Sequence, residues 1–382
     1  MTISGRVETS HSHSFRAQVK EIFRVTLVAE SMSRTKGFHY IVMMDTSGSM
    51  AGEKLALAKK GAEEYVRKIP PGNVLSFLTF SDSVKVTKEV SATLDLSDSL
   101  PMVETGGETK LYTALQAAFD LARRREVPGW IVILTDGEPT DVMQPEMYRA
   151  LKIPKGFQLI EFGIGNDYNE GILKALADAS GGSLFYIPNP SELPSMLEKS
   201  AVEQVAAKNV KVEFLGSSAV SLLNYQGPPA NINAVSGATK IWGDVIIPAN
   251  HSGQIAEVRV SYDDDVDGKR KEFSLPIAVS ASSSEEEFMS GVNKALISEF
   301  KYYQGLEQYY KDLASGKLRE AEKTMKLMTL NAEQTRRTDL IEVTKRLSSN
   351  LEMTKKLGGS TEMTKNLSKE AASEATKKAR GS

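Results

Sequence analysis

The residues of this 382-residue chain best suited to chemistry are an aspartate and two serines at alternating positions, Asp45, Ser47 and Ser49. They directly follow an apolar run over residues 39–44, which predicts a buried parallel strand. Carboxylate and hydroxyl oxygens are hard ligands that suit Mg²⁺, Mn²⁺ or Ca²⁺. Ligands of open α/β sheets bind beyond the carboxyl ends of the strands. The motif therefore predicts a metal site at this edge of a sheet.

Two further segments extend the pattern. A glycine-rich loop at residues 106–110 leads into a predicted helix, and a second buried strand at 130–135 ends in Asp136. With the first motif, they resemble the von Willebrand factor A (vWA) family and its metal-ion-dependent adhesion site. The resemblance implies Mg²⁺ or Mn²⁺ as the ion. It implies as its ligands Asp45, Ser47, Ser49, Thr109 and Asp136.

Two alternatives stay open at this site. Family loops read Gly-Gly-Thr, whereas Glu108 intervenes here. Thr109 keeps the following helix in the family register, and Thr105 is the other possible ligand. A reading without metal is that Ser47 and Ser49 only cap the helix that starts near Gly52.

The elements that must position these residues form a strand–helix alternation over residues 37–206. Such alternation predicts a doubly wound, mostly parallel α/β sheet, the Rossmann-like fold of a vWA domain. An additional short strand near residues 84–86 is expected at an antiparallel edge. The predicted strands cover 38–45, 73–80, 129–135, 157–163 and 183–187, and the predicted helices cover about 52–68, 111–125, 168–179 and 191–206.

Strictly alternating patterns flank this domain on both sides. Residues 19–28 alternate, as do several runs within 207–282, and turn-forming residues separate the runs. We therefore expect residues 1–36 and 207–282 to form one small antiparallel β-sandwich into which the vWA domain is inserted.

The C-terminal part has two expected regions. Apolar residues at spacings of three and four predict a bundle of three helices over 283–357. Residues 358–382 have few large apolar side chains, which predicts a flexible tail rich in Ser, Thr and Lys. This tail is either merely solvated or a modification and docking segment. Its hydroxyls, with that of Thr354, are expected to be exposed. The phosphorylation candidates are Thr354, Thr361, Thr364, Ser368, Ser373 and Thr376.

Composition narrows the function classes. The absence of cysteine excludes disulfides, thiolate metal sites and cysteine nucleophiles. A formal net charge of -2 gives no overall field that attracts nucleic acid. No run approaches the roughly 20 apolar residues of a membrane span, and the N-terminus lacks the apolar core of a signal peptide. We expect a cytoplasmic protein without nucleic-acid or membrane partners.

The resemblance gives these features a function. A vWA site implies binding rather than catalysis: a partner's carboxylate completes the shell of the metal. The overall layout is similar to archaeal vWA regulators that pair with a forkhead-associated (FHA) domain protein. That similarity implies repression of archaellum (motility) expression and action by Ser/Thr kinases and phosphatases. The alternatives are a partner subunit of an AAA+ ATPase, as in chelatases, and a hydrolase that uses the metal to activate water.

Overall fold

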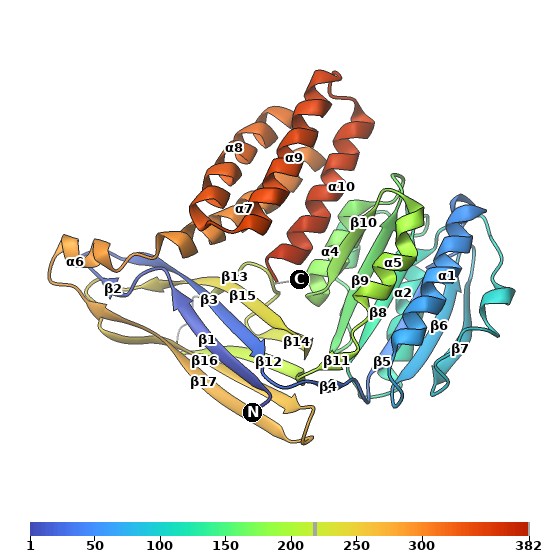
Figure 1. The fold of residues 1–382 in the computed structure, drawn as a ribbon, viewed down its shortest axis with the longest axis horizontal. Coiled ribbons are helices and arrows are strands. Elements are labelled where there is room, and N and C mark those ends of the chain that lie inside the picture. Colours follow the sequence, from blue (N-terminus) through green and yellow to red (C-terminus); the bar gives the residue numbers. More distant parts are fainter. Residues whose placement is uncertain (217–219, 381–382) are drawn as a thin grey trace.

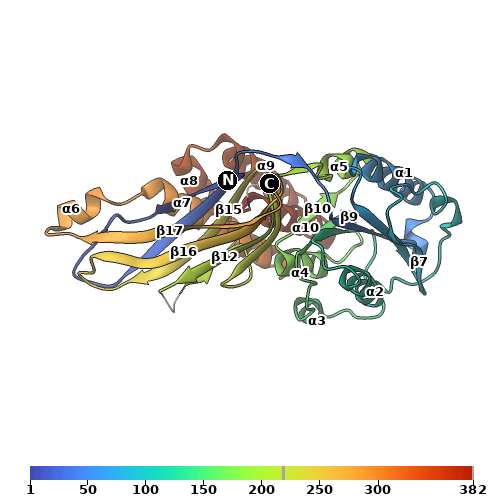
Figure 2. The same cartoon turned by 90° about the horizontal axis from the view of Figure 1, so that it is seen from below.

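A computed structural model describes residues 1–216 and 220–380 of the chain. Three parts lie side by side in Figure 1: a β-sandwich, a vWA-like α/β domain and a helical bundle above both. Seen from below, the sandwich and the α/β domain form the two ends of an elongated molecule (Figure 2). No helix of the described residues is both long enough and apolar enough to span a membrane.

The α/β domain is built on a six-stranded sheet in the order β10-β9-β8-β5-β6-β7. Five strands are parallel, and β7 pairs with β6 in the antiparallel sense. The predicted strands and the antiparallel edge strand are thereby confirmed. The strands are β5 (His39–Asp45), β6 (Val74–Phe80), β7 (Val84–Ser91), β8 (Gly129–Thr135), β9 (Phe157–Ile164) and β10 (Ser183–Ile187).

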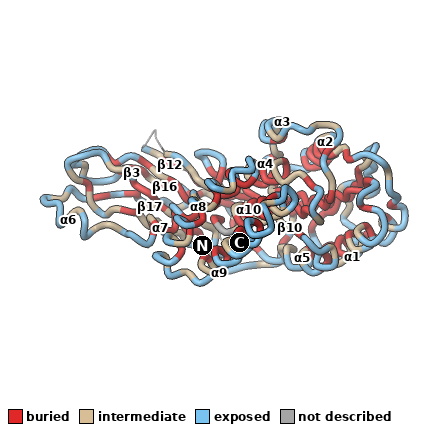
Figure 3. The backbone as a smooth tube through the Cα atoms, turned by 90° about the horizontal axis from the view of Figure 1, so that it is seen from above, coloured by how far each residue is buried: buried red, intermediate tan, exposed pale blue. Residues whose placement is uncertain are grey.

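Helices cover both faces of this sheet because its central strands are apolar on both sides. One face packs against α1 and α5, and the other against α2 and α4. Figure 3 shows the buried backbone concentrated along this sheet. The helices are α1 (Glu53–Lys68), α2 (Leu111–Arg123), α3 (Pro145–Arg149), α4 (Glu170–Ser180) and α5 (Leu193–Ser200).

The sandwich joins both flanks of the α/β domain, as predicted. Its first sheet has the order β1-β3-β15-β13 and its second the order β14-β12-β16-β17-β2. The N-terminal strand β3 pairs with β15 over ten residue pairs, from Val19–Ile247 to Val28–Ala238. The longer strands are β1 (Ile3–Thr9), β3 (Val19–Ala29), β12 (Ala207–Leu215), β14 (Ala230–Val235), β15 (Ala238–Ile247), β16 (Gly253–Asp264) and β17 (Arg270–Ala281). The two-residue strands are β2 (His13–Ser14), β4 (Ser33–Arg34), β11 (Gln204–Val205) and β13 (Ser221–Leu222).

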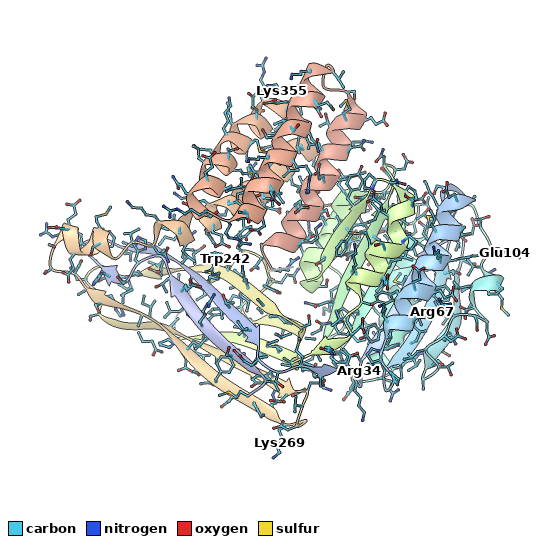
Figure 4. The ribbon with its side chains drawn as sticks, viewed as in Figure 1. Arg34, Arg67, Glu104, Trp242, Lys269 and Lys355 are labelled. Atoms are coloured by element: carbon cyan, nitrogen blue, oxygen red, sulfur yellow. The ribbon has the colours of Figure 1, made fainter. Side chains whose placement is uncertain are left out.

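The C-terminal bundle has four long helices where the sequence predicted three. The predicted first helix is interrupted at Gly291, so a short exposed helix, α6 (Glu285–Ser290), precedes α7 (Lys294–Ala314). The others are α8 (Leu318–Thr335), α9 (Thr338–Lys356) and α10 (Thr361–Lys378). Trp242 of β15 packs on Phe300 and Tyr303 of α7, and its label in Figure 4 marks the junction between the sandwich and the bundle.

The flexible tail predicted for residues 358–382 is wrong for the described residues 358–380. Most of this segment is the helix α10, which lies between α7, α4 and the edge strand β10. Leu367, Ala371 and Ala372 are buried there, as are several polar side chains. The polar composition that predicted solvation instead serves hydrogen bonds to the edge of the sheet. Residues 381–382 lie outside the described residues.

Candidate metal centre

The candidate metal centre lies at the carboxyl edge of the central parallel strands. Asp45 ends β5 and Asp136 directly follows β8, and these two strands are neighbours. Both carboxylates are completely buried. Two residues far apart in the sequence thus meet because parallel strands end at the same edge of the sheet.

Asp45 is held by hydrogen bonds on both carboxylate oxygens. The backbone N–H of Ser47 donates to Oδ1 at 2.8 Å, and the Thr135 hydroxyl donates to Oδ2 at 2.5 Å. Burial raises the pKa of Asp45 to about 6, the hydrogen bonds from Thr135 and Ser47 oppose this rise, and the charge of Asp136 adds to it. Burial disfavours the ionised form of this carboxylate, and a nearby cation would stabilise that form.

Asp136, the second carboxylate of the site, is linked to the two serines through the Ser49 hydroxyl. Ser49 donates from its hydroxyl to Asp136 Oδ1 at 2.7 Å, and the Ser47 and Ser49 hydroxyl oxygens lie 3.1 Å apart. The other oxygen, Oδ2, accepts from Lys54 Nζ at 2.5 Å. Ser49 is exposed whereas Ser47 is buried. The cluster therefore opens to solvent at Ser49.

Thr109 joins this cluster from the glycine-rich loop. It is 5% exposed, and a Cβ built on Gly137 would lie 3.1 Å from its Oγ1 and 3.6 Å from Ser49 Oγ. Thr105, the alternative, is exposed. The geometry thus favours Thr109 as the threonine of the site.

The loop before Thr109 is fixed by Asp82, which follows β6. Its carboxylate accepts from the backbone N–H groups of Gly107, at 2.7 Å, and Glu108, at 3.2 Å. The bond from Gly107 is the largest contribution that lowers the pKa of Asp82. A side chain at Gly106 would collide with Ser81 and Asp82, since an added Cβ would lie 2.3 Å from Ser81 Oγ. Glycine at this position is therefore required for the loop to approach the strand ends.

The start of α2 is fixed in a similar way. Its unpaired N-terminal N–H groups find an acceptor in Asp141, to which Thr113 donates at 2.8 Å and Tyr112 at 3.3 Å. This ties the helix that follows Thr109 to the loop that follows Asp136. Four residues that hold this site in place were not predicted from the sequence: Lys54, Asp82, Thr135 and Asp141. Asp82 lies two residues after the end of β6, so a search for acids close behind a predicted strand could have found it.

The donor set fits a hard divalent cation. It offers two carboxylates and three hydroxyls, and among the described residues Lys54 is the one cation in direct contact with either carboxylate. Within the described ranges, no group of three or more His, Cys, Asp or Glu side chains is arranged to hold a metal. A metal here would therefore depend on the hydroxyls of Ser47, Ser49 and Thr109, which is hard-ion chemistry.

The candidate phosphorylation residues lie on α9 and α10. Thr361 is exposed at the first position of α10. The remaining five are at most 8% exposed, so the expectation of exposed hydroxyls is wrong for Thr354, Thr364, Ser368, Ser373 and Thr376. Their hydroxyls donate within the helices or contact the α/β domain.

Comparison with known proteins decides the family. Residues 41–199 match the von Willebrand factor type A domain, and residues 294–381 match the family described as Archaellum regulatory network B, C-terminal domain. The ArnB paralog VWA2 from Sulfolobus acidocaldarius is 30% identical in sequence to this chain, and its crystal structure matches the fold with a TM-score of 0.84. The match covers 100% of this chain and 98% of that one. The chain belongs to the family of ArnB-like vWA proteins.

This ArnB-like chain is also similar, at lower sequence identity, to proteins of other organisms. A von Willebrand factor type A structure from Catenulispora acidiphila, 15% identical, shares the fold with a TM-score of 0.72 over 91% of this chain and 89% of that one. An uncharacterised Synechocystis protein is 22% identical over 62% of this chain and 56% of its own length. The human von Willebrand factor A domain-containing protein 5A is 26% identical over 45% of this chain and 24% of its own length. The chain spans about half or less of the length of these curated relatives.

Proposed function

We propose that the protein is a non-catalytic interaction scaffold that binds a partner protein through a divalent metal at the Asp45 site. The observation that carries this proposal is the pair of buried carboxylates, Asp45 and Asp136, converging with hydroxyl oxygens at a solvent-open sheet edge. Asp45, Ser47, Ser49, Thr109 and Asp136 would hold Mg²⁺ or Mn²⁺. The bound ion would supply a positive charge that a carboxylate of the partner can contact.

The residues around the ion favour binding over turnover. The ligands and the side chains that contact them include no histidine or cysteine. Lys54 is engaged with Asp136, and Asp45 is held by two donors. A hydrolase would need a further base near the ion to activate water. What these side chains do is hold carboxylates in place and leave one open direction at Ser49.

The family supplies the biological setting of the proposal. An ArnB-like vWA protein is consistent with a role in the archaellum regulatory network. We infer that the protein is a cytoplasmic regulator that represses archaellum (motility) expression together with an FHA-domain partner. Ser/Thr kinases and phosphatases would control this regulator.

The burial of the hydroxyls orders the candidate phosphorylation sites. Thr361 is exposed and follows the N-cap Ser360, so a phosphate there would lie at a helix N-terminus, where negative charge is favourable. The five buried hydroxyls can reach a kinase only when α9 or α10 moves away from its contacts. We therefore expect Thr361 to be modified first.

Capture of partners from native lysate tests the metal and the phosphate together. The full chain and its Asp45→Ala variant would each be used as bait, with EDTA or phosphatase treatment. A partner that is lost with EDTA and with Asp45→Ala, but kept after phosphatase, places binding at the metal site. Loss of an FHA-domain protein after phosphatase treatment would support recruitment of that protein by phosphorylated residues of α9 and α10. Partners indifferent to all three changes contradict the proposal, and a metal-dependent AAA+ ATPase would favour the other vWA role.

A further inference from the structure

A cavity of about 770 Å³ lies where the amino ends of β8 and β9 meet the sandwich. Asn233 of β14 belongs to this junction, because its side chain donates to the carbonyl of Gly129, the first residue of β8, at 3.0 Å. The walls of the cavity come from the end of α2, the loop before β9 and the sandwich strands β12 and β14. The Asp45 site lies at the carboxyl ends of the parallel strands, so the two sites are at opposite edges of the sheet. A cavity of this size suits a small-molecule ligand.

Positive charge predominates around this cavity. Two of its lining residues are acids, Glu126 and Asp263, and one of these is already neutralised: Asp263 accepts from Arg270 Nη1 at 2.8 Å and from Asn209 Nδ2 at 2.7 Å. The whole chain has a formal net charge of -2, so the excess of cations is local to this cavity. The cationic lining residues are Arg123, Arg125, Lys155, Lys211 and Arg270.

Two of these cations are available to a ligand. In the part of the chain that the structure describes, neither Arg125 nor Lys155 has an ion pair or a side-chain hydrogen bond, and both side chains are exposed. Each could therefore bind an anion without giving up an existing partner. A guanidinium binds phosphate through two parallel hydrogen bonds, and a lysine ammonium binds it as a point charge.

The buried part of the lining is apolar. Ala122, Val210 and Ile232 line the cavity and are at most 3% exposed. Asn231, beside Ile232, is exposed, and its side-chain amide has no hydrogen-bond partner among the described residues. An amide can both donate to and accept from a polar ring edge. The cavity thus combines an apolar surface, a free amide and cations, which is typical of a site for an amphipathic anion.

We propose that this cavity binds a nucleotide, with its phosphates paired to Arg125 and Lys155 and its base against the buried apolar residues of the lining. A nucleotide joins phosphate charge to a flat aromatic ring with polar edges, which are the features that the cations, the apolar residues and Asn231 can recognise. Because residues of both the α/β domain and the sandwich line the cavity, the ligand would contact both parts. This site is separate from the Asp45 site and needs no metal there.

Isothermal titration calorimetry of the full chain with ADP, in EDTA to keep metal out of the Asp45 site, tests the proposal. The double variant Arg125→Ala/Lys155→Ala should weaken binding at least tenfold. The matched control is Arg124→Ala/Lys152→Ala, which removes the same charge at exposed positions nearby that do not line the cavity. The control should bind ADP as the native chain does. No binding by the native chain, or an equal loss in both double variants, would contradict a site in this cavity.

Partial ligands test the two halves of the site. Pyrophosphate and adenosine should each bind the native chain at least tenfold more weakly than ADP. Of the two, pyrophosphate should be the one that is weakened by Arg125→Ala/Lys155→Ala. Glu126→Gln removes the exposed acid of the lining and should strengthen the binding of ADP and of pyrophosphate. Pyrophosphate that binds as tightly as ADP would mean an anion site without a place for the base, which would overturn the nucleotide as ligand.

Photolabelling of the native chain with azido-ADP locates the ligand and remains decisive if a variant fails to fold. The labelled peptides should include residues 122–127, 154–156 or 209–211, and excess unlabelled ADP should prevent the labelling. Labelling confined to other segments would contradict the assignment of the cavity. An oligoglutamate peptide that displaces ADP and binds more tightly would make an acidic segment of a partner protein the ligand, and would also overturn the proposal.

Discussion

Asp136 has two contacts that a metal would have to accommodate: the Ser49 hydroxyl on one oxygen and the Lys54 ammonium on the other. The lysine is 27% exposed and its partner is completely buried, so the ion pair lies at the rim of the site. A fixed positive charge at this distance opposes the entry of a second cation.

Lys54→Met should therefore raise the affinity for Mg²⁺ or Mn²⁺ by about threefold to tenfold, equivalent to roughly 1 kcal/mol. Isothermal titration calorimetry would measure the change. Lys60→Met is the matched control on the same helix, because Lys60 is exposed and its ion pair in the described structure is with Glu64, at 3.9 Å. Equal or weaker binding by Lys54→Met would show that the ammonium does not compete with the metal.

Much of the candidate site could be predicted from the sequence because its residues follow directly on recognisable strands. Asp45 and Asp136 are examples, since the shared edge of a parallel sheet brings them together. Lys54 and Asp141 were not predicted. Their roles depend on where α1 and the loop after β8 lie in space, which local patterns do not specify.

At the scale of elements, the start of β5 contains a buried histidine. His39 is completely buried, its ring nitrogen Nε2 lies 2.8 Å from Ser76 Oγ, and its Nδ1 has no hydrogen-bond partner among the residues that the structure describes. Burial, and secondarily the charge of Arg125, lower the pKa of His39 to about 4.

A base with a lowered folded-state pKa stabilises the fold above its unfolded pKa of about 6.5, and this contribution is lost as the pH falls toward 4. When the pH falls from 7 to 5, the free energy of unfolding should decrease by about 2 kcal/mol because of His39. Urea unfolding of the native chain and of His39→Gln at the two pH values measures the difference. The variant should lose less stability on acidification than the native chain. Parallel losses in both would contradict the assignment.

The helix α10 provides a second test at this scale. Leu367 is 3% exposed at its interface, and Leu357, just before the helix, is 65% exposed. Leu367→Ala should destabilise α10 by about 2–5 kcal/mol and make the Gly358–Gly359 link sensitive to limited proteolysis. Leu357→Ala should have little effect. Cleavage that is equal in the two variants would mean that α10 is not held by Leu367.

The helix α10 also shows where sequence patterns fail. Strands such as β5 and β8 were predicted because apolar runs record burial directly. The polar composition of α10 predicted solvent, but Ser373 and Thr376 contact the backbone of β10 instead. Only the position of an edge strand with free backbone groups explains such residues, and that position is a property of the folded sheet.

At the scale of the whole molecule, the bundle is joined to the sandwich by a charged network around Glu299 of α7. Arg24 of β3 donates to Glu299 Oε2 at 2.6 Å, Arg337 contacts Oε1, and Lys240 Nζ lies 3.8 Å from Oε1. Arg24 also stacks over Trp242 at 5.0 Å from the ring centroid. The Glu299 side chain is only 7% exposed.

Glu299→Ala should destabilise the protein by about 1–3 kcal/mol. The three cations would lose the carboxylate that they share, but Arg24 keeps its pair with Glu8 and Arg337 keeps its pair with Asp339. The exposed pair between Arg123 and Asp120 offers a control, and Arg123→Ala should change stability by less than about 0.5 kcal/mol. Thermal or chemical unfolding compares the two variants. A small effect of Glu299→Ala would show that the network does not hold the bundle to the sandwich.

The central claim is that Asp45 and its neighbours form a metal site. A titration of the full chain with Mn²⁺, followed by the electron paramagnetic resonance signal of free Mn²⁺, tests it most directly. We predict that the native chain and the exposed-site control Asp95→Ala bind about one equivalent. Asp45→Ala should bind none while keeping its circular dichroism spectrum. Binding by Asp45→Ala that equals that of the native chain, or no binding by the native chain, would contradict the claim.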